Sequence, residues 1–109
     1  VGEAPLMNTK TALTYVNENK KELDMMISFQ HMNADCIIIE WVHTPFSLPK
    51  LKKTFNDWQT KLYHRAWNAN YLENHDHARI ISRYGSEEYR VESGKALFYA
   101  VYDVSPMAI

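Results

Sequence analysis

Hydrophobic residues recur every three or four positions along the middle of the chain. From Ser47 to Leu62 these positions form one apolar face, and the lysines lie away from it. Ser47 can cap the first free amides of a helix here, and Pro49 suits the first turn, where its missing N–H costs little. The pattern predicts an amphipathic helix that buries Leu48, Leu51, Phe55, Trp58 and Leu62.

Two further segments are compatible with helices. Asn8 or Thr9 can cap the first, which presents Leu13 and Val16 at helical spacing before a polar turn. The second runs from about residue 87 to 102 and ends close to the C-terminus. Its predicted apolar positions are Val91, Leu97, Phe98 and Val101.

Short apolar runs lie between these helices and predict strands. Residues 1–3, 23–30 and 69–73 are short enough for strands, and the second run is almost continuously apolar, as in a parallel sheet buried on both faces. Residues 36–39 are a further β-branched run that fits a short strand or a buried loop. Strands alternating with helices predict an α/β fold with a parallel sheet and helices packed outside it.

Composition narrows the possible functions. The 109 residues carry 12 basic and 13 acidic side chains, a net charge of -1 that does not suggest nucleic-acid binding. Cys36 is the single cysteine, which excludes an internal disulfide framework and a multi-cysteine zinc cluster. No apolar run approaches the roughly 20 residues of a membrane span. Only three glycines occur, and the chain opens on Val1 without an initiator Met, so we expect a piece of a larger domain.

Polar residues gather where the predicted strands end. Glu3 ends the first strand, His31 follows the second, and residues 74–77 read Asn-His-Asp-His after the third. The carboxyl ends of parallel strands converge on one mouth, where ligands bind. A lone Glu is weak evidence, and a loop cap or solvated turn would equally explain the four polar residues.

Two chemistries fit these residues. If the third strand continued, Glu73, His75 and His77 would share one face and could hold zinc, but no second cluster supports this, so we expect no metal and no cofactor. Glu3 and Asp76 suit cleavage of a glycosidic bond, which needs a proton for the leaving oxygen and a negative field opposite the oxocarbenium-like centre. Cys36 lies among isoleucines and is interpreted as an inert buried thiol.

Several motifs together resemble one family. Residues 1–5, Val-Gly-Glu-Ala-Pro, resemble the loop that carries the general acid in the α-amylase superfamily of glycoside hydrolases. Residues 71–85 look like its Asn-His-Asp motif. Arg79, Ser82–Gly85, Phe55–Gln59 and Tyr89–Ala96 resemble its oligo-1,6-glucosidase and α-glucosidase branch.

The resemblance implies a fold and roles for individual residues. The family fold is a (β/α)8 barrel, of which residues 1–109 resemble strands five to seven with their helices, too few to close it. Glu3 would be the general acid/base and Asp76 the transition-state stabiliser of a retaining mechanism. His75 would bond the same sugar ring, and Arg79 would line the pocket near the scissile bond. The substrate would be an α-linked gluco-oligosaccharide, and the location cytoplasmic.

The sequence also departs from the family. No Asp matches the nucleophile, which the family carries on the preceding strand, so we expect the chain to be inactive alone. Ala4 and Leu6 replace the usual Met and Gly, and His77-Ala78 replaces Gln-Pro. The resemblance ends near residue 102. Two alternatives stay open: a sucrose isomerase-type transglycosylase, and a non-catalytic glycosidase-like interaction subunit, which the presence of Glu3, His75 and Asp76 disfavours.

Overall fold

The computed structural model describes residues 1–20, 22–37, 42–104 and 107–108. Its strands form an open four-stranded parallel sheet in the order β1-β2-β3-β4, which confirms the α/β class predicted from the sequence. The strands are β1 (Gly2–Glu3), β2 (Met25–Ile27), β3 (Trp67–Asn70) and β4 (Met107–Ala108). The helices are α1 (Thr9–Val16), α2 (Leu48–Leu62), α3 (Ile80–Tyr84) and α4 (Arg90–Val104), with a 3₁₀ helix, η1 (Gln30–Asn33).

Helix α2 follows the predicted pattern closely. The Ser47 hydroxyl accepts from the Lys50 amide at 3.4 Å, and Pro49 lies in the first turn. The side chains of Leu51, Phe55, Trp58 and Leu62 are all buried, whereas Leu48 at the start of the helix is about half exposed. The indole N–H of the buried Trp58 has a hydrogen-bond partner, because it donates to Gln30 Oε1 at 2.8 Å.

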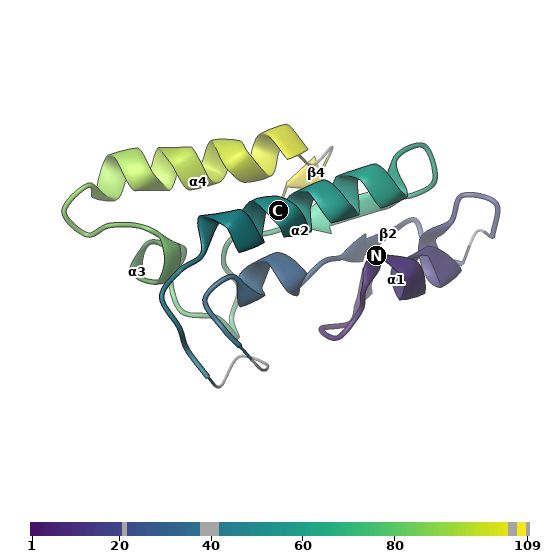
Figure 1. The fold of residues 1–109 in the computed structure, drawn as a ribbon. Helices are drawn as coiled ribbons and strands as arrows, with labels where there is room; N and C mark the ends of the chain where they lie inside the picture. Colours follow the sequence, from purple (N-terminus) through teal and green to yellow (C-terminus); the bar gives the residue numbers. More distant parts are fainter. Residues whose placement is uncertain (21, 38–41, 105–106, 109) are drawn as a thin grey trace.

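Two apolar clusters hold the elements together. Helices α1 and α2 meet over β2 in a cluster of Ala12, Val16, Met26, Trp58 and Leu62. A larger cluster joins η1, α2, α3 and α4, which accounts for the neighbouring courses of α2 and α4 (Figure 1). Its members are Phe29, Met32, Ala34, Leu51, Phe55, Tyr71, Ile80, Tyr84, Leu97 and Val101.

Helix α1 is capped by Asn8, one of the two predicted caps. The Asn8 Oδ1 accepts from the Thr11 amide at 3.0 Å, which satisfies a backbone donor that has no partner within the helix. Val16 is buried and Leu13 is partly buried against the same cluster. The short amphipathic pattern therefore predicted both the start of this helix and its packing face.

The predicted face of α4 is half wrong. Leu97 and Val101 are buried, but Val91 and Phe98 are 62% and 53% exposed. The helix turns Leu97 and Val101 towards the larger cluster, and 3.6 residues per turn place Val91 and Phe98 outside that contact. Phe98 instead stacks on Tyr102 of the same helix, with ring centroids 5.7 Å apart.

Strand bounds differ more from prediction than helix bounds. β2 is shorter than the predicted 23–30 because the chain turns into η1 at Gln30. β3 begins at Trp67, two residues before the predicted 69–73, and it includes two buried asparagines. Cys36 forms a single antiparallel bridge to His43, while residues 38 and 39 of the predicted run lie outside the described residues. Helix α3 and strand β4 were not predicted.

Candidate functional site

The register of the sheet brings the predicted strand ends to one edge. Glu3 lies level with Ile27 of β2 and, through it, with Ala69 of β3. The loops that follow β1 and β3 therefore leave the sheet on the same side. Adjacent strands lie about 4.8 Å apart, so β1 and β3, with β2 between them, are separated by roughly 10 Å.

Glu3 is the last residue of β1, and its side chain is exposed. The chain then enters the loop that leads to α1, in which the Met7 amide donates to the Ala4 carbonyl at 3.2 Å. This turn contains the Ala4 and Leu6 positions that depart from the family pattern, and Leu6 is 84% exposed. The carboxylate is thus presented at the edge of the sheet rather than buried in its core.

The Asn-His-Asp-His loop is held in shape by its first residue. Asn74 Oδ1 accepts from the Asp76 and His77 amides, both at 3.0 Å, as in an Asx turn. His77 Nδ1 also lies 2.7 Å from this oxygen, and 3.2 Å from the Tyr71 hydroxyl. The bends that Asn74 stabilises leave the side chains of His75 and Asp76 in solvent.

His75 and Asp76 are brought together. His75 Nε2 lies 3.4 Å from Asp76 Oδ2, and the two side chains are 82% and 61% exposed. An exposed carboxylate beside an imidazole can bond the hydroxyl groups of a sugar, because both accept or donate hydrogen bonds without first leaving a buried partner.

Arg79 is paired with Glu73 from the start of the same loop. Arg79 Nη1 donates to Glu73 Oε2, while Glu73 Oε1 accepts from the Ile80 amide at 3.1 Å at the beginning of α3. These bonds, led by the one from Arg79, hold the pKa of Glu73 below its ordinary value. Glu73 thereby links the start of the loop to Arg79 at its end and to the first turn of α3.

A family model described as "Alpha amylase, catalytic domain" matches residues 1–108 of the chain. The chain belongs to the alpha-amylase catalytic-domain family.

Curated relatives of this family member are glucoside-cleaving enzymes by name. The chain is 42% identical over 99 residues to an oligo-1,6-glucosidase of Parageobacillus thermoglucosidasius, covering 89% of the chain and 18% of the relative. It is 41% identical over 105 residues to a trehalose-6-phosphate hydrolase of Bacillus subtilis, covering 94% and 19%. The chain thus spans about a fifth of the length of the curated relatives that it matches.

Solved structures agree with this assignment. The trehalose-6-phosphate hydrolase of Bacillus licheniformis superposes with a TM-score of 0.89 at 35% identity, over 98% of the chain and 20% of the enzyme. A trehalulose synthase mutant superposes with a TM-score of 0.87 at 25% identity, over 99% of the chain and 20% of that structure. The described elements of this alpha-amylase-family chain are therefore arranged as in much longer relatives.

The zinc triad that a longer third strand would create is not formed. β3 ends at Asn70, so Glu73, His75 and His77 do not alternate along a strand, and Glu73 is engaged by Arg79. Within the described ranges, the side chains whose metal-binding atoms lie within 4.8 Å of one another are instead Asp35, Cys36 and His43.

No helix in the described part of the chain is both long and apolar enough to cross a bilayer.

The sequence places His31 after the second predicted strand and so predicts it at the same edge of the sheet as Glu3 and Asp76. This prediction is wrong, because His31 is part of the core. Its side chain is 1% exposed and stacks on Phe55 with ring centroids 5.4 Å apart. Its Nε2–H donates to the Tyr71 carbonyl at 2.5 Å. The 3₁₀ helix that follows β2 rotates this imidazole inward, which a strand-end pattern does not predict.

Sequence reasoning missed a buried polar ladder beneath the candidate site. The Ser28 hydroxyl donates to Asn70 Oδ1 at 2.7 Å, and the Asn68 side-chain amide donates to the same oxygen at 2.9 Å. The Ser28 amide also donates to the Ala69 carbonyl at 3.0 Å. These bonds fasten the end of β2 to the end of β3 and so position the loops that leave both strands. Two asparagines at positions i and i+2 of a strand were the available signal.

The buried His31 makes stability depend on pH. Burial, with smaller contributions from the charges of His77 and Arg83, lowers its pKa to about 4, against the opposing effect of its bond to Tyr71. The unfolded chain, with a His pKa of about 6.5, therefore binds more protons between pH 6.5 and 4. We expect the free energy of unfolding to fall by about 3 kcal/mol as pH drops through this window.

Urea unfolding between pH 7.5 and 4 measures this effect. The variant His31→Gln, which cannot titrate there, should lose most of the slope, while His64→Asn at an exposed position should keep it. A His31→Gln variant that keeps the wild-type slope would show that another group is responsible.

Proposed function

We propose that this chain contributes to the active site of a retaining α-glucosidase that hydrolyses α-glucosidic bonds of small oligosaccharides. Glu3 and Asp76 are its catalytic residues, and His75 and Arg79 bind substrate. In this proposal β1, β2 and β3 are strands five to seven of a (β/α)8 barrel. The observation that carries it is that two loops with the family's motifs leave one edge of a parallel sheet in a chain of this family.

Glu3 moves the proton in both halves of the proposed reaction. Its carboxylic acid donates a proton to the glycosidic oxygen as the bond from that oxygen to the anomeric carbon breaks. An aspartate outside these 109 residues forms the covalent glycosyl-enzyme. Glu3, now a carboxylate, takes a proton from the water that attacks the anomeric carbon and releases the aspartate. Its exposed position at the end of β1 supports both steps, because the leaving group and the water must reach the same carboxyl group.

Asp76 and His75 act on the sugar ring. The Asp76 carboxylate accepts hydrogen bonds from sugar hydroxyls, and these bonds strengthen as positive charge develops on the ring. His75, 3.4 Å from this carboxylate, bonds the same ring and limits the rotation of Asp76. Arg79 leaves the loop near the scissile bond, and its pairing with Glu73 supports a fixed orientation there.

The relatives favour hydrolysis over transfer. Those at about 40% identity are named as oligo-1,6-glucosidases and a trehalose-6-phosphate hydrolase. The trehalulose synthase is 25% identical, so a sucrose isomerase-type transglycosylase is the second candidate. A non-catalytic interaction subunit fits less well because it would not need Glu3, His75 and Asp76. The proposal also includes a cytoplasmic location for the enzyme, in addition to its small-oligosaccharide substrate.

A chimera tests the proposal. The chain replaces the 99-residue segment that it matches in the oligo-1,6-glucosidase of Parageobacillus thermoglucosidasius. We expect the chimera to release glucose from isomaltose, whereas the isolated 109-residue chain shows no turnover of an aryl α-glucoside. Sucrose separates the two candidates, because hydrolysis yields glucose and fructose and transfer yields an isomer of sucrose.

Two outcomes would contradict the proposal. A chimera that folds with the circular dichroism of the parent enzyme but cleaves no α-glucoside would remove the assigned roles. Turnover by the isolated chain that Glu3→Gln abolishes would show that the nucleophile is present within it.

A further inference from the structure

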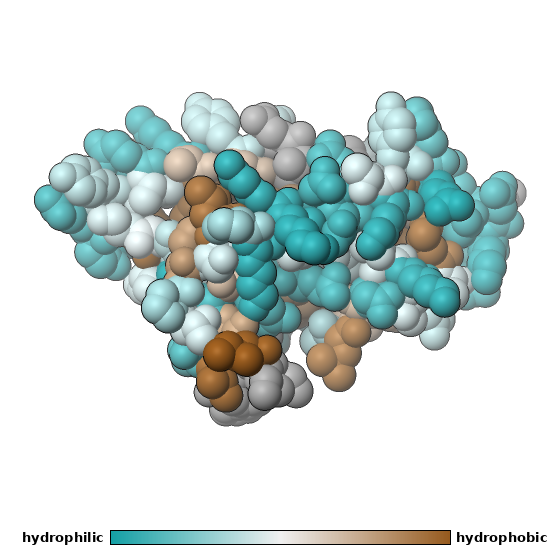
Figure 2. Space-filling model, in the orientation of Figure 1, coloured by the Kyte–Doolittle hydropathy of each residue, from teal (hydrophilic) through white to brown (hydrophobic). Residues whose placement is uncertain are grey.

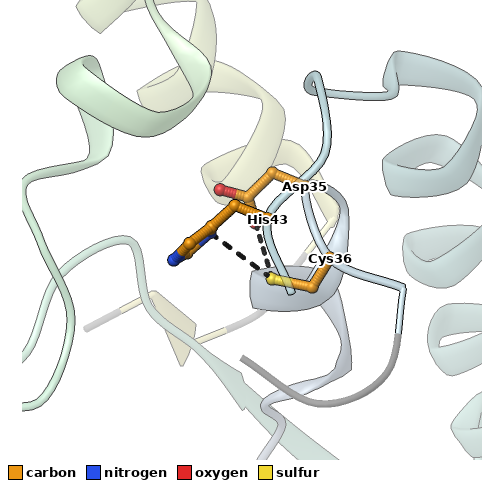
Figure 3. A group of neighbouring side chains, drawn as sticks. All are labelled: Asp35, Cys36 and His43. Atoms are coloured by element: carbon orange, nitrogen blue, oxygen red, sulfur yellow. Dashed lines mark hydrogen bonds between the residues drawn. The ribbon is translucent and has the colours of Figure 1, made fainter. Parts of the chain in front are cut away.

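Cys36 and His43 face each other across a short hairpin stem after η1. They form an antiparallel bridge, flanked by backbone bonds from the Ile37 amide to the Val42 carbonyl at 3.1 Å and from the Thr44 amide to the Asp35 carbonyl at 2.7 Å. Residues directly opposite in an antiparallel pair carry their side chains on the same face. Figure 3 shows the Cys36 thiol, the His43 ring and the Asp35 carboxylate pointing towards one another.

The distances among the three ligand atoms are close to those of a metal site. Cys36 Sγ lies 3.3 Å from Asp35 Oδ1 and 4.0 Å from His43 Nδ1, and all three atoms lie within 4.8 Å of one another. Zn²⁺ bonds of about 2.3 Å to sulfur and 2.0–2.2 Å to nitrogen and oxygen place tetrahedral ligand atoms about 3.4–3.6 Å apart. Small side-chain rotations would therefore bring the three atoms to bonding positions around one ion.

We propose that Asp35, Cys36 and His43 form a binding site for a thiophilic divalent cation, with Zn²⁺ as the natural candidate. A thiolate, an imidazole and a carboxylate are ligands that zinc uses, and a thiolate disfavours Mg²⁺ and Ca²⁺. The thiol now donates to Asp35 Oδ1, so the ion takes the place of that proton, which passes to solvent as the sulfur–metal bond forms. The site is independent of the proposed glucosidase chemistry.

Neighbouring residues orient the ligands and limit the affinity. Arg83 donates to both oxygens of Asp35, at 2.6 and 3.0 Å, which fixes the carboxylate while leaving lone pairs for an ion. Lys50 donates to the Cys36 carbonyl, so two positive charges stand near the site. Cys36 and Asp35 are buried and His43 is exposed, so the ion enters from the His43 side and keeps a water as fourth ligand. We expect weaker binding than at a four-residue structural site.

Cobalt provides a spectroscopic probe of this site. Co²⁺ is titrated into the untagged, reduced 109-residue chain, and the sulfur-to-cobalt charge-transfer absorption in the near ultraviolet is recorded. We expect one equivalent to saturate the band, Zn²⁺ to displace it, and Mg²⁺ in excess to leave it. Cys36→Ser should abolish the band, and His43→Asn should weaken Co²⁺ binding at least about tenfold.

His64→Asn is the matched control for His43→Asn. His64 is exposed at a φ of 53°, a conformation that Asn tolerates well, so the substitution removes an imidazole without strain. Cobalt binding should be unchanged in this variant. A folded wild-type chain without the band would overturn the proposal. A band that His43→Asn affects no more than His64→Asn would also overturn it, because the thiol would then act without its cross-strand partner.

Discussion

Replacing Glu3 by glutamine in the chimera is expected to lower kcat for isomaltose by about 10²–10⁴-fold, the usual contribution of a general acid. Glutamine keeps the size and exposure of the side chain at the end of β1 but cannot donate a proton to the leaving oxygen. The alkoxide of a sugar is a poor leaving group, so this loss acts directly on the first bond cleavage. KM should change much less than kcat.

An external nucleophile separates the role of Glu3 from that of Asp76. Azide attacks a glycosyl-enzyme without a general base, so it should restore turnover of an aryl α-glucoside by Glu3→Gln and give a glucosyl azide of retained configuration. Asp76→Asn should lose activity to a similar degree without rescue, because its defect lies in stabilising the charged ring and not in moving a proton. Glu88→Gln, at another exposed glutamate, is the control and should keep parental activity.

Opposite patterns would reassign the residues. Azide rescue of Asp76→Asn with retained configuration would assign proton transfer to Asp76, and a Glu3→Gln enzyme within tenfold of the parent would show that Glu3 is not the general acid/base. Circular dichroism of each variant chimera is compared with that of the parent chimera. A loss of activity that comes from a folding defect is thereby recognised.

Elements that pack with a regular period were predictable from the sequence. Helix α2 begins at its predicted cap and buries four of the five predicted positions, because one repeated apolar face has only one low-energy way to meet the sheet. The parallel order also followed from alternating strands and helices. α4 fails this test because Val91 and Phe98 stay exposed, although they are as apolar as the buried Leu97 and Val101.

The short elements and the polar interior were not predictable in the same way. β3 contains Asn68 and Asn70, which propensity places in turns, and their partners come from each other and from Ser28 on a separate strand. The sequence predicted that the Asn-His-Asp-His loop follows a strand, because the loop comes shortly after an apolar run in the sequence. The approach of His43 to Cys36 depended on hairpin pairing that no periodicity signals.

The buried pair of Arg83 and Asp35 joins the segment after β2 to helix α3, and breaking it should have a large effect on stability. Arg83 donates to both Asp35 oxygens and to the Met32 carbonyl, and the two side chains are 8% and 7% exposed. Burial alone would raise the pKa of Asp35, but the bonds and charge of Arg83, together with the hydrogen bond from the Cys36 thiol and a backbone bond, hold that pKa below its ordinary value. The carboxylate is therefore stable inside only with its partner.

Arg83→Met should lower the free energy of unfolding by about 3–5 kcal/mol at pH 7, measured by urea denaturation, because it leaves a buried carboxylate without a cation. The control Lys53→Met removes an ion pair to Asp57 whose side chains are 75% and 33% exposed, and should cost less than about 1 kcal/mol. The double variant Asp35→Leu/Arg83→Met should recover much of the loss, since it leaves no buried charge.

The pH dependence identifies the cause of this destabilisation. Without Arg83, we expect burial to outweigh the remaining bonds and to raise the pKa of Asp35 above its unfolded value, so that the folded variant takes up a proton that the unfolded chain does not. The stability difference between wild type and Arg83→Met should therefore shrink as pH falls through this raised pKa. Because the charge of Arg83 contributes to the lowered pKa of His31, both proteins are compared in the His31→Gln background, in which that imidazole does not titrate. A loss that is constant with pH, or that the double variant fails to recover, would attribute the effect to lost packing of the Arg83 stem instead of an unpaired charge.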